Sequence, residues 1–177
     1  MVYVRAAARL DGYSKVLLKP AVVLPNRDWR NAKSGSASKT PMNLKPILAE
    51  VTDMVRAEAE TALKAGGYTI VEVPGEDVAE VSPAIVDFVL VALEANAAHG
   101  DEMGARSVGK ASLVVDVRDS VSGELILHAF DQEVGPGTTD VAWMDAKNWI
   151  RSAITVWATA LRDGLDVSSG KKSVAVR

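Results

Sequence analysis

The chain has 177 residues, of which 48% are hydrophobic and 24% are charged, and its net charge at pH 7 is −3. This length suits one domain, and this composition is that of an ordinary globular chain, not of a disordered or fibrous one. The sequence has no cysteine, which excludes disulfides, thiolate nucleophiles and sulfur metal ligands, and its apolar stretches fall short of the ~20 residues that cross a bilayer.

The first predicted element is a strand with a break. Residues 13–24 are rich in branched apolar side chains but contain Pro20, which cannot donate a hydrogen bond within a sheet and therefore favours an edge or a bulge. Residues 26–43 follow, with a polar Gly/Ser run over 33–41. We expect a mobile loop there, because such a segment buries too little apolar surface to offset its ordering entropy.

A helix is predicted over residues 44–65. Its apolar residues recur at the three- and four-residue spacing of one helix face. Asn43 can cap it, Pro46 is tolerable in the first turn, and Gly66-Gly67 supplies a left-handed stop. A short strand over 68–73 follows and ends at Pro74-Gly75.

The second half of the chain predicts three strands and a helix. Residues 84–95 are apolar at both alternating sets of positions, which suits a central strand, although a buried helix would have the same composition. Residues 111–118 alternate as in a half-buried strand, and 124–134 form the return strand of a hairpin around Gly123. A last helix, capped near Asp140, runs to about Leu165.

These elements, in the order β-α-β-β-β-β-α, predict an α+β fold. A two-layer sandwich, in which a five-stranded and mostly antiparallel sheet carries both helices on one face, buries the apolar stripe of each helix most simply. We expect a single domain over residues 1–166 and a loose C-terminal tail over 167–177.

The sequence offers no recognisable constellation for catalysis. His99 and His128 lack the paired spacing of metal ligands, and His128 is better explained as a sheet-face or core imidazole than as part of a triad. No glycine-rich phosphate loop occurs, and aromatic residues are not interleaved with basic ones as in nucleic-acid-binding surfaces. We therefore predict no catalytic residue, no metal ligand, no cofactor and no nucleic-acid partner.

The charge is unevenly distributed along the chain. Residues 1–45 contain nine Lys/Arg against two acidic residues. This region could steer toward an anionic partner or a lipid surface, but solvated charges at loops and strand edges are the simpler explanation, because the basic residues are spread out and have no interleaved aromatic residues. Trp149 and Trp157 fit the apolar stripe of the last helix, so the candidate contact residues for a partner or a membrane are Arg27, Trp29, Arg30 and Trp143.

Several segments resemble a bacterial family defined as a domain of unknown function. These segments are Tyr13 to Val22, Arg27-Asp-Trp-Arg30, Gly66-Gly-Tyr-Thr-Ile-Val71, Pro74-Gly-Glu-Asp-Val78, Asp119 to Glu124 and Trp157 to Asp166. They span roughly residues 3–166, and the family consists of lipoproteins of Gram-negative envelopes. The resemblance implies no activity and no catalytic residue.

The resemblance also implies a location. Members carry an export signal that ends at a lipidated cysteine, so the domain would face the periplasm, anchored to the outer membrane. This sequence has neither feature, so Met1 is either a start that replaces a removed segment or the mark of an unlipidated member. A lipid anchor would suit the basic N-terminal third, since one acyl chain gives only marginal binding and nearby cations add to it.

Two functional hypotheses remain. The first is a non-enzymatic periplasmic module of the cell envelope that binds a protein partner or acts as an adaptor. The second is a small-molecule or lipid carrier, or an unfamiliar enzyme, with a cavity between sheet and helices. A pocket of ~300 Å³ or more with converging polar groups such as Asp116, Arg118 and His128 would favour the second.

Overall fold

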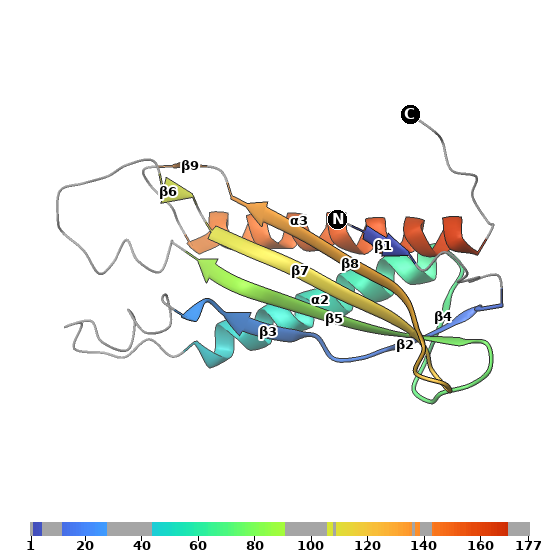
Figure 1. The fold of residues 1–177 in the computed structure, drawn as a ribbon. Coiled ribbons are helices and arrows are strands. Elements are labelled where there is room, and N and C mark those ends of the chain that lie inside the picture. The colour runs from blue at the N-terminus through green and yellow to red at the C-terminus, as the bar shows by residue number, and fades with distance from the viewer. Residues whose placement is uncertain are drawn as a thin grey trace.

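The computed structural model describes residues 2–4, 12–27, 44–90, 106–107, 109–135, 137–138 and 143–169. Two helices, α2 (Lys45–Ala65) and α3 (Trp143–Ser168), lie side by side on one face of a twisted sheet (Figure 1). The predicted α+β fold with both helices on one face is therefore confirmed. Neither described helix is long and apolar enough to cross a membrane.

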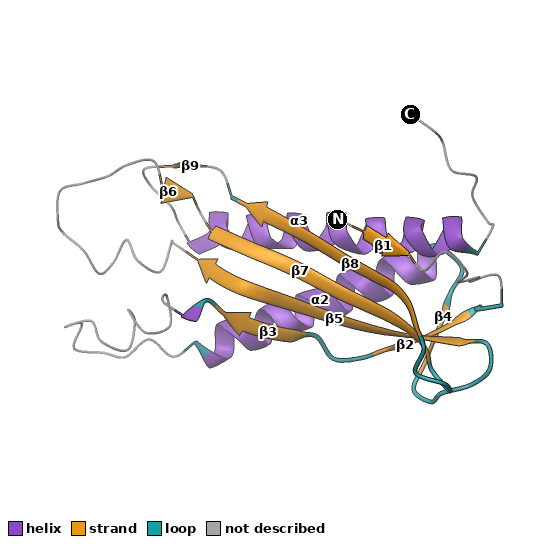
Figure 2. Ribbon diagram, viewed as in Figure 1, coloured by secondary structure: helices purple, strands orange, loops and turns teal. Residues whose placement is uncertain are grey.

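The main sheet has the strand order β1-β8-β7-β5-β2-β4, and β3 also pairs with β5 (Figure 2). Its strands are β1 (Val2–Val4), β2 (Lys15–Leu18), β3 (Val22–Pro25), β4 (Thr69–Val71), β5 (Val78–Leu90), β7 (Gly109–Asp119) and β8 (Leu125–Val134). A small second sheet pairs β6 (Arg106–Ser107) with β9 (Gly137–Thr138).

The described sheet has seven strands and is mixed, which differs from the five mostly antiparallel strands that the sequence predicts. The pairs β2–β4, β2–β5 and β3–β5 are parallel, whereas β5–β7, β7–β8 and β1–β8 are antiparallel. Helix α2 crosses over between β3 and β4, and a helical crossover is the usual connection between parallel strands. Turn residues in the sequence indicate only hairpins, whose strands are antiparallel, so the sequence did not predict the parallel pairs.

The predicted break in the first strand is confirmed. β2 and β3 lie end to end along β5, with β2 beside residues 78–81 and β3 beside residues 84–88. Pro20 lies between β2 and β3, and Pro83 of β5 lies opposite the gap. Both prolines, which have no N–H to donate, thus lie where the pairing of β2 and β3 with β5 is interrupted.

The central strand begins earlier than the sequence predicts. β5 begins at Val78 instead of Ala84, and residues 91–95 of the expected strand lie outside the described ones. It also contains a bulge at Asp87, whose φ is 52°, between the paired residues Val86 and Val89. Pro83 and the acidic residues before Val78 hid the strand start, because both are typical of loops.

The helix boundaries agree closely with the expected ones. α2 carries Pro46 in its first turn and is followed by Gly67 with a φ of 79°, as predicted. Leu44 occupies the N-cap instead of Asn43, which lies outside the described residues. α3 continues to Ser168, three residues past its expected end, while residues 28–43 of the predicted loop and the tail beyond 169 lie outside the described part.

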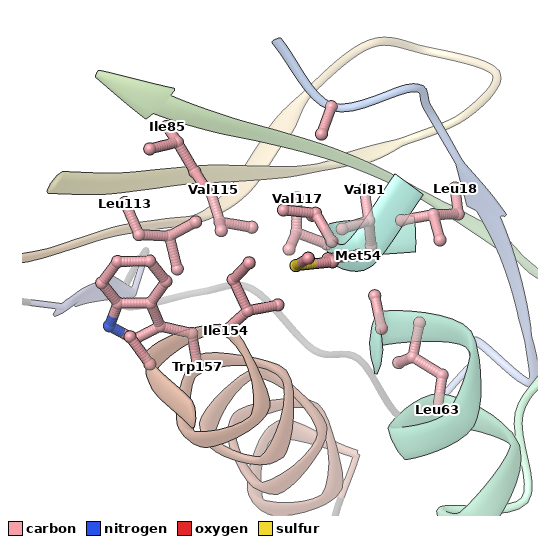
Figure 3. Close-up of a cluster of buried hydrophobic side chains, with 14 of the residues drawn as sticks. Leu18, Met54, Leu63, Val81, Ile85, Leu113, Val115, Val117, Ile154 and Trp157 are labelled. Atoms are coloured by element: carbon pink, nitrogen blue, oxygen red, sulfur yellow. The ribbon is translucent and has the colours of Figure 1, made fainter. Parts of the chain in front are cut away.

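The core lies between the sheet and the two helices. Figure 3 shows Leu18, Met54, Leu63, Val81, Ile85, Leu113, Val115, Val117, Ile154 and Trp157, all of them buried, converging from the two layers. In β7, and in β5 before the bulge at Asp87, the side chains that point to the helices are the odd-numbered ones, whereas Phe88, beyond the bulge, is buried in the core. Up to the bulge, the even-numbered side chains therefore point to the opposite face, on which no described helix packs.

Candidate functional site

The face of the sheet opposite the helices carries an apolar row across four strands. Val22 of β3 pairs with Ala84 of β5, Ala84 with Val114 of β7, and Val114 with Phe130 of β8. The two end residues, Val22 and Phe130, are 52% and 40% exposed, and the two between them are half-buried. We call Val22, Ala84, Val114 and Phe130 the apolar row.

A polar cluster borders the apolar row on the same face. His128 Nδ1 lies 2.6 Å from Asp116 Oδ1, and Arg118 Nη2 donates to Asp116 Oδ2 at 2.9 Å. Arg118 also donates through Nη1 to the carbonyl oxygen of Gly123 at 3.2 Å. Asp116 and Arg118 of β7 and His128 of β8 thus form a single network around the Asp116 carboxylate.

The network sets the charge state of Asp116. Partial burial acts to raise the pKa of this carboxyl, but the hydrogen bonds from His128 and Arg118, with the charge of Arg118, outweigh it and hold the pKa below its usual value. Asp116 is therefore ionised at neutral pH. This ionised carboxylate holds both the imidazole and the guanidinium against the sheet.

The cluster does not have the geometry of a catalytic triad. Along the row of paired residues the order is Ser82, Asp116, His128, so the carboxylate lies between the hydroxyl and the imidazole. In a serine triad the imidazole must lie between the other two. Among the described residues no group of three His, Cys, Asp or Glu could hold a metal ion. The cluster is suited to polar recognition at a surface.

A second feature lies on the other side of the sheet, where an apolar groove of about 200 Å³ opens between β8 and α3. Its walls are Leu113, Val115, Leu127, Ala129, Phe130, Asp131, Trp157, Ala160, Leu161 and Gly164. Trp157 Nε1 donates to Asp131 Oδ2 at 2.9 Å within it. The groove is smaller than the ~300 Å³ typical of small-molecule sites, and Asp116, Arg118 and His128 lie on the opposite face of the sheet.

The contact residues that the sequence suggests lie mostly outside the described part. Trp29 and Arg30 are not described, and Trp143 is described only as the first residue of α3. Arg27, just after β3, is exposed. The predicted packing of the other tryptophans is confirmed, with Trp157 buried and Trp149 against the core.

The basic residues of the first strand are used within the fold. Lys15 Nζ lies 3.0 Å from Asp77, and Lys19 Nζ lies 3.3 Å from Glu80. These ion pairs agree with solvated strand-edge charges, the simpler of the two explanations of the basic N-terminal third. The sequence alone did not indicate the apolar row, because its members come from four strands and meet only through the register.

No protein-family model matches the sequence, and no curated protein matches it. Among solved structures, protein XCC0632 from Xanthomonas campestris, of the family DUF330, is similar over 97% of this chain and 93% of its own, with 12% identity and a TM-score of 0.54. The chain shares this fold.

Two further solved structures resemble the chain. The PelC dodecamer from Paraburkholderia phytofirmans covers 96% of this chain and 97% of its own at 12% identity, with a TM-score of 0.49. A minor lipoprotein from Acinetobacter baumannii covers 90% and 95% at 13% identity, with a TM-score of 0.45. The predicted resemblance to a family of unknown function is thus confirmed at the level of the fold, and lipoproteins of Gram-negative bacteria are among the similar structures.

Proposed function

We propose that this chain is a non-enzymatic, lipoprotein-type module of the bacterial cell envelope that docks a protein partner through the open face of its sheet. The apolar row carries this proposal. An apolar band bordered by polar groups has the composition of a protein interface, with a dry centre and a polar rim. The polar cluster of Asp116, Arg118 and His128 supplies that rim on one side.

The chemistry of the face favours a protein over a bilayer or a nucleic acid. Two ion pairs lie on it, Arg118 with Asp116 and Lys19 with Glu80. Anionic lipids and phosphate backbones attract clusters of uncompensated cations instead. An apolar row beside internally neutralised charges is suited to the mixed surface of another protein.

The envelope location is the part of the proposal that rests on resemblance. The family resemblance in the sequence supports it, and the fold shared with XCC0632, of the family DUF330, agrees with that resemblance. We expect the domain to face the periplasm, held at the outer membrane by a lipid anchor. The carrier alternative receives no comparable support, because the groove is small and the polar cluster lies on the other face of the sheet.

Site-specific cross-linking in cells tests the proposal. A photo-reactive amino acid at Val22 or Phe130 should capture one discrete partner protein, and the double substitution Val22→Glu and Phe130→Glu should abolish co-purification of that partner. The matched control is Val156, which is 60% exposed on the helix layer. Cross-links at Val156 that equal those at Val22, or a partner that survives the double substitution, would refute docking at this face.

A further inference from the structure

The outer edge of β8 is only partly paired. β1 pairs with residues 127–129, since Val2 lies opposite Ala129 and Val4 opposite Leu127, whereas β8 continues to Val134. Over Asp131–Val134 the inner side pairs with β7, and no described strand pairs with the outer side. Such an edge presents backbone N–H and C=O groups that can pair with another strand.

The groove between β8 and α3 adjoins this edge at Asp131 and extends from there past Ala129 and Leu127, where β1 pairs with β8. Part of its wall is formed by small residues, Ala129, Ala160 and Gly164. Gly164 lies inside α3, where glycine is less favourable than alanine, and a Cβ at this position would meet nothing within 4 Å. No described side chain therefore fills this part of the groove, and a side chain from outside can enter it.

The same edge is acidic on its groove side. Asp131 lies opposite Leu113 and Glu133 opposite Ala111, so both carboxylates are on the helix-facing side of β8, two residues apart. Neither forms an ion pair among the described residues, and the hydrogen bond from Trp157 holds the Asp131 carboxylate at the rim. On a strand added to this edge, the side chains that lie next to these two carboxylates would also be two residues apart.

We propose that the Asp131–Val134 edge and the adjoining groove form a strand-docking site for an extended segment of a protein that carries Arg or Lys at alternate positions. The segment continues the line of β1, antiparallel to β8, and its backbone pairs with the outer edge. The aliphatic stem of one cationic side chain lies over the groove while its charged head meets Asp131 and Glu133. This site shares Phe130 with the apolar row but lies on the helix side of the sheet, so it adds a second contact surface to the module.

Two other classes of ligand are disfavoured by the charge. Anionic lipid surfaces and nucleic acids would be repelled by two carboxylates that no described cation neutralises. A second copy of the chain docking through the same edge would place the four carboxylates of two edges together. A cationic segment of another protein is the occupant that complements this edge.

Binding of short peptides to the whole chain tests the site. Fluorescence anisotropy is measured with a labelled Thr-Arg-Thr-Arg-Val-Thr peptide and with Thr-Glu-Thr-Glu-Val-Thr as its charge-reversed control. We expect only the arginine peptide to bind, and the double substitution Asp131→Asn and Glu133→Gln to weaken it at least tenfold. Asn at position 131 keeps an oxygen that accepts from Trp157. Asp53→Asn, at an exposed carboxylate of α2, is the matched control and should change nothing.

Pairing is separated from simple charge attraction by a third peptide, Thr-Arg-Pro-Arg-Val-Thr, which has the same charge but lacks one backbone donor. It should bind at least tenfold more weakly. The groove-filling substitution Ala160→Leu should also weaken the arginine peptide, with circular dichroism confirming that the fold is retained. Equal binding of the proline peptide, or unchanged affinity in the Asp131/Glu133 variant, would overturn the proposal.

The oligomeric state provides a further test. A dimer in sedimentation that the Asp131/Glu133 variant dissociates would overturn the assignment to a different protein. Cross-linking at Val22 does not depend on this edge. If the peptides do not bind, the proposed function therefore still stands. If cross-linking at Val22 finds no partner, the peptide experiment still tests the strand-docking site.

Discussion

At the scale of single residues, hydrogen bonds to Asp119 join the segment before β2 to the β7–β8 turn. Asp119 accepts hydrogen bonds from the Ser122 N–H at 2.6 Å and from the Tyr13 hydroxyl at 2.7 Å. The Ser122 N–H, the Tyr13 hydroxyl and the Ser122 hydroxyl lower the pKa of Asp119 to about 2. Burial, followed by the hydrogen bond to Asp119 and its charge, raises the pKa of Tyr13 to about 12.

These two shifts predict how stability depends on pH. Asp119 has a folded-state pKa below its unfolded value of 3.8, so its contribution is present above pH 4 and is lost as the pH falls toward 2. Tyr13 has a folded-state pKa above its unfolded value of 10.0, so its contribution is present below pH 10 and is lost as the pH rises toward 12. Urea unfolding measured across this range should show both losses.

The substitution Tyr13→Phe isolates the pair. We expect it to lower the free energy of unfolding at pH 7 by about 1 kcal/mol or less, since this is the usual net value of a hydrogen bond and the site is partly exposed. The difference in the free energy of unfolding between the variant and the parent should shrink below pH 2, where Asp119 is protonated. Between pH 10 and 12 the variant should lose less stability than the parent. Parallel pH profiles for the two proteins would contradict this assignment.

At the scale of elements, two glycines differ in whether the backbone conformation at their position requires glycine. Gly67, in the turn between α2 and β4, has a φ of 79°, a conformation that residues with a Cβ rarely adopt. Gly164 lies within α3 and borders the groove, with open space where its Cβ would be. Only the first of these two glycines is required by the fold.

We therefore expect opposite effects from two alanine substitutions. Gly164→Ala should raise the free energy of unfolding by up to about 1 kcal/mol, the difference in helix propensity, which corresponds to ~2–4 °C in melting temperature. Gly67→Ala should lower it by about 1–2 kcal/mol because of the left-handed conformation. Differential scanning calorimetry of both variants measures this, and a destabilised Gly164→Ala variant would mean that the helix cannot accept a Cβ there.

At the scale of the whole molecule, stability comes from the single core that the sheet shares with both helices. Leu63 of α2, Ile85 of β5 and Ile150 of α3 are among its most buried side chains. Ion pairs between the helices, such as Arg151 with Glu58, are exposed and contribute little. The energetic link between the layers is therefore apolar packing.

Truncation in this core should be costly. Leu63→Ala should lower the free energy of unfolding by about 2–5 kcal/mol, the range for a buried leucine that leaves a cavity. Val156→Ala, at an exposed position of α3, should change it by less than about 0.5 kcal/mol. Urea denaturation at pH 7 gives both values, and equal effects would show that the layers are not joined through this core.

Local chemistry made much of this architecture predictable from the sequence. Pro20 broke the first strand, the apolar stripes gave both helices nearly to their ends, and Gly123 marked the hairpin with its φ of 72°. These signals depend on residues close together in the chain. The start of β5 was missed because Pro83 is tolerated only where β2 and β3 leave a gap in the pairing, which is a property of the neighbouring strands.

By itself, the sequence established an α+β chain with two amphipathic helices and no recognised catalytic motif. The tertiary structure alone decided which strands run parallel, which residues form the apolar row, and where Asp131 and Glu133 lie beside a groove on an edge that no described strand covers. The reason is physical: helix and turn preferences act over a few residues, whereas strand register joins segments far apart in the chain. Both proposed contact surfaces depend on that register.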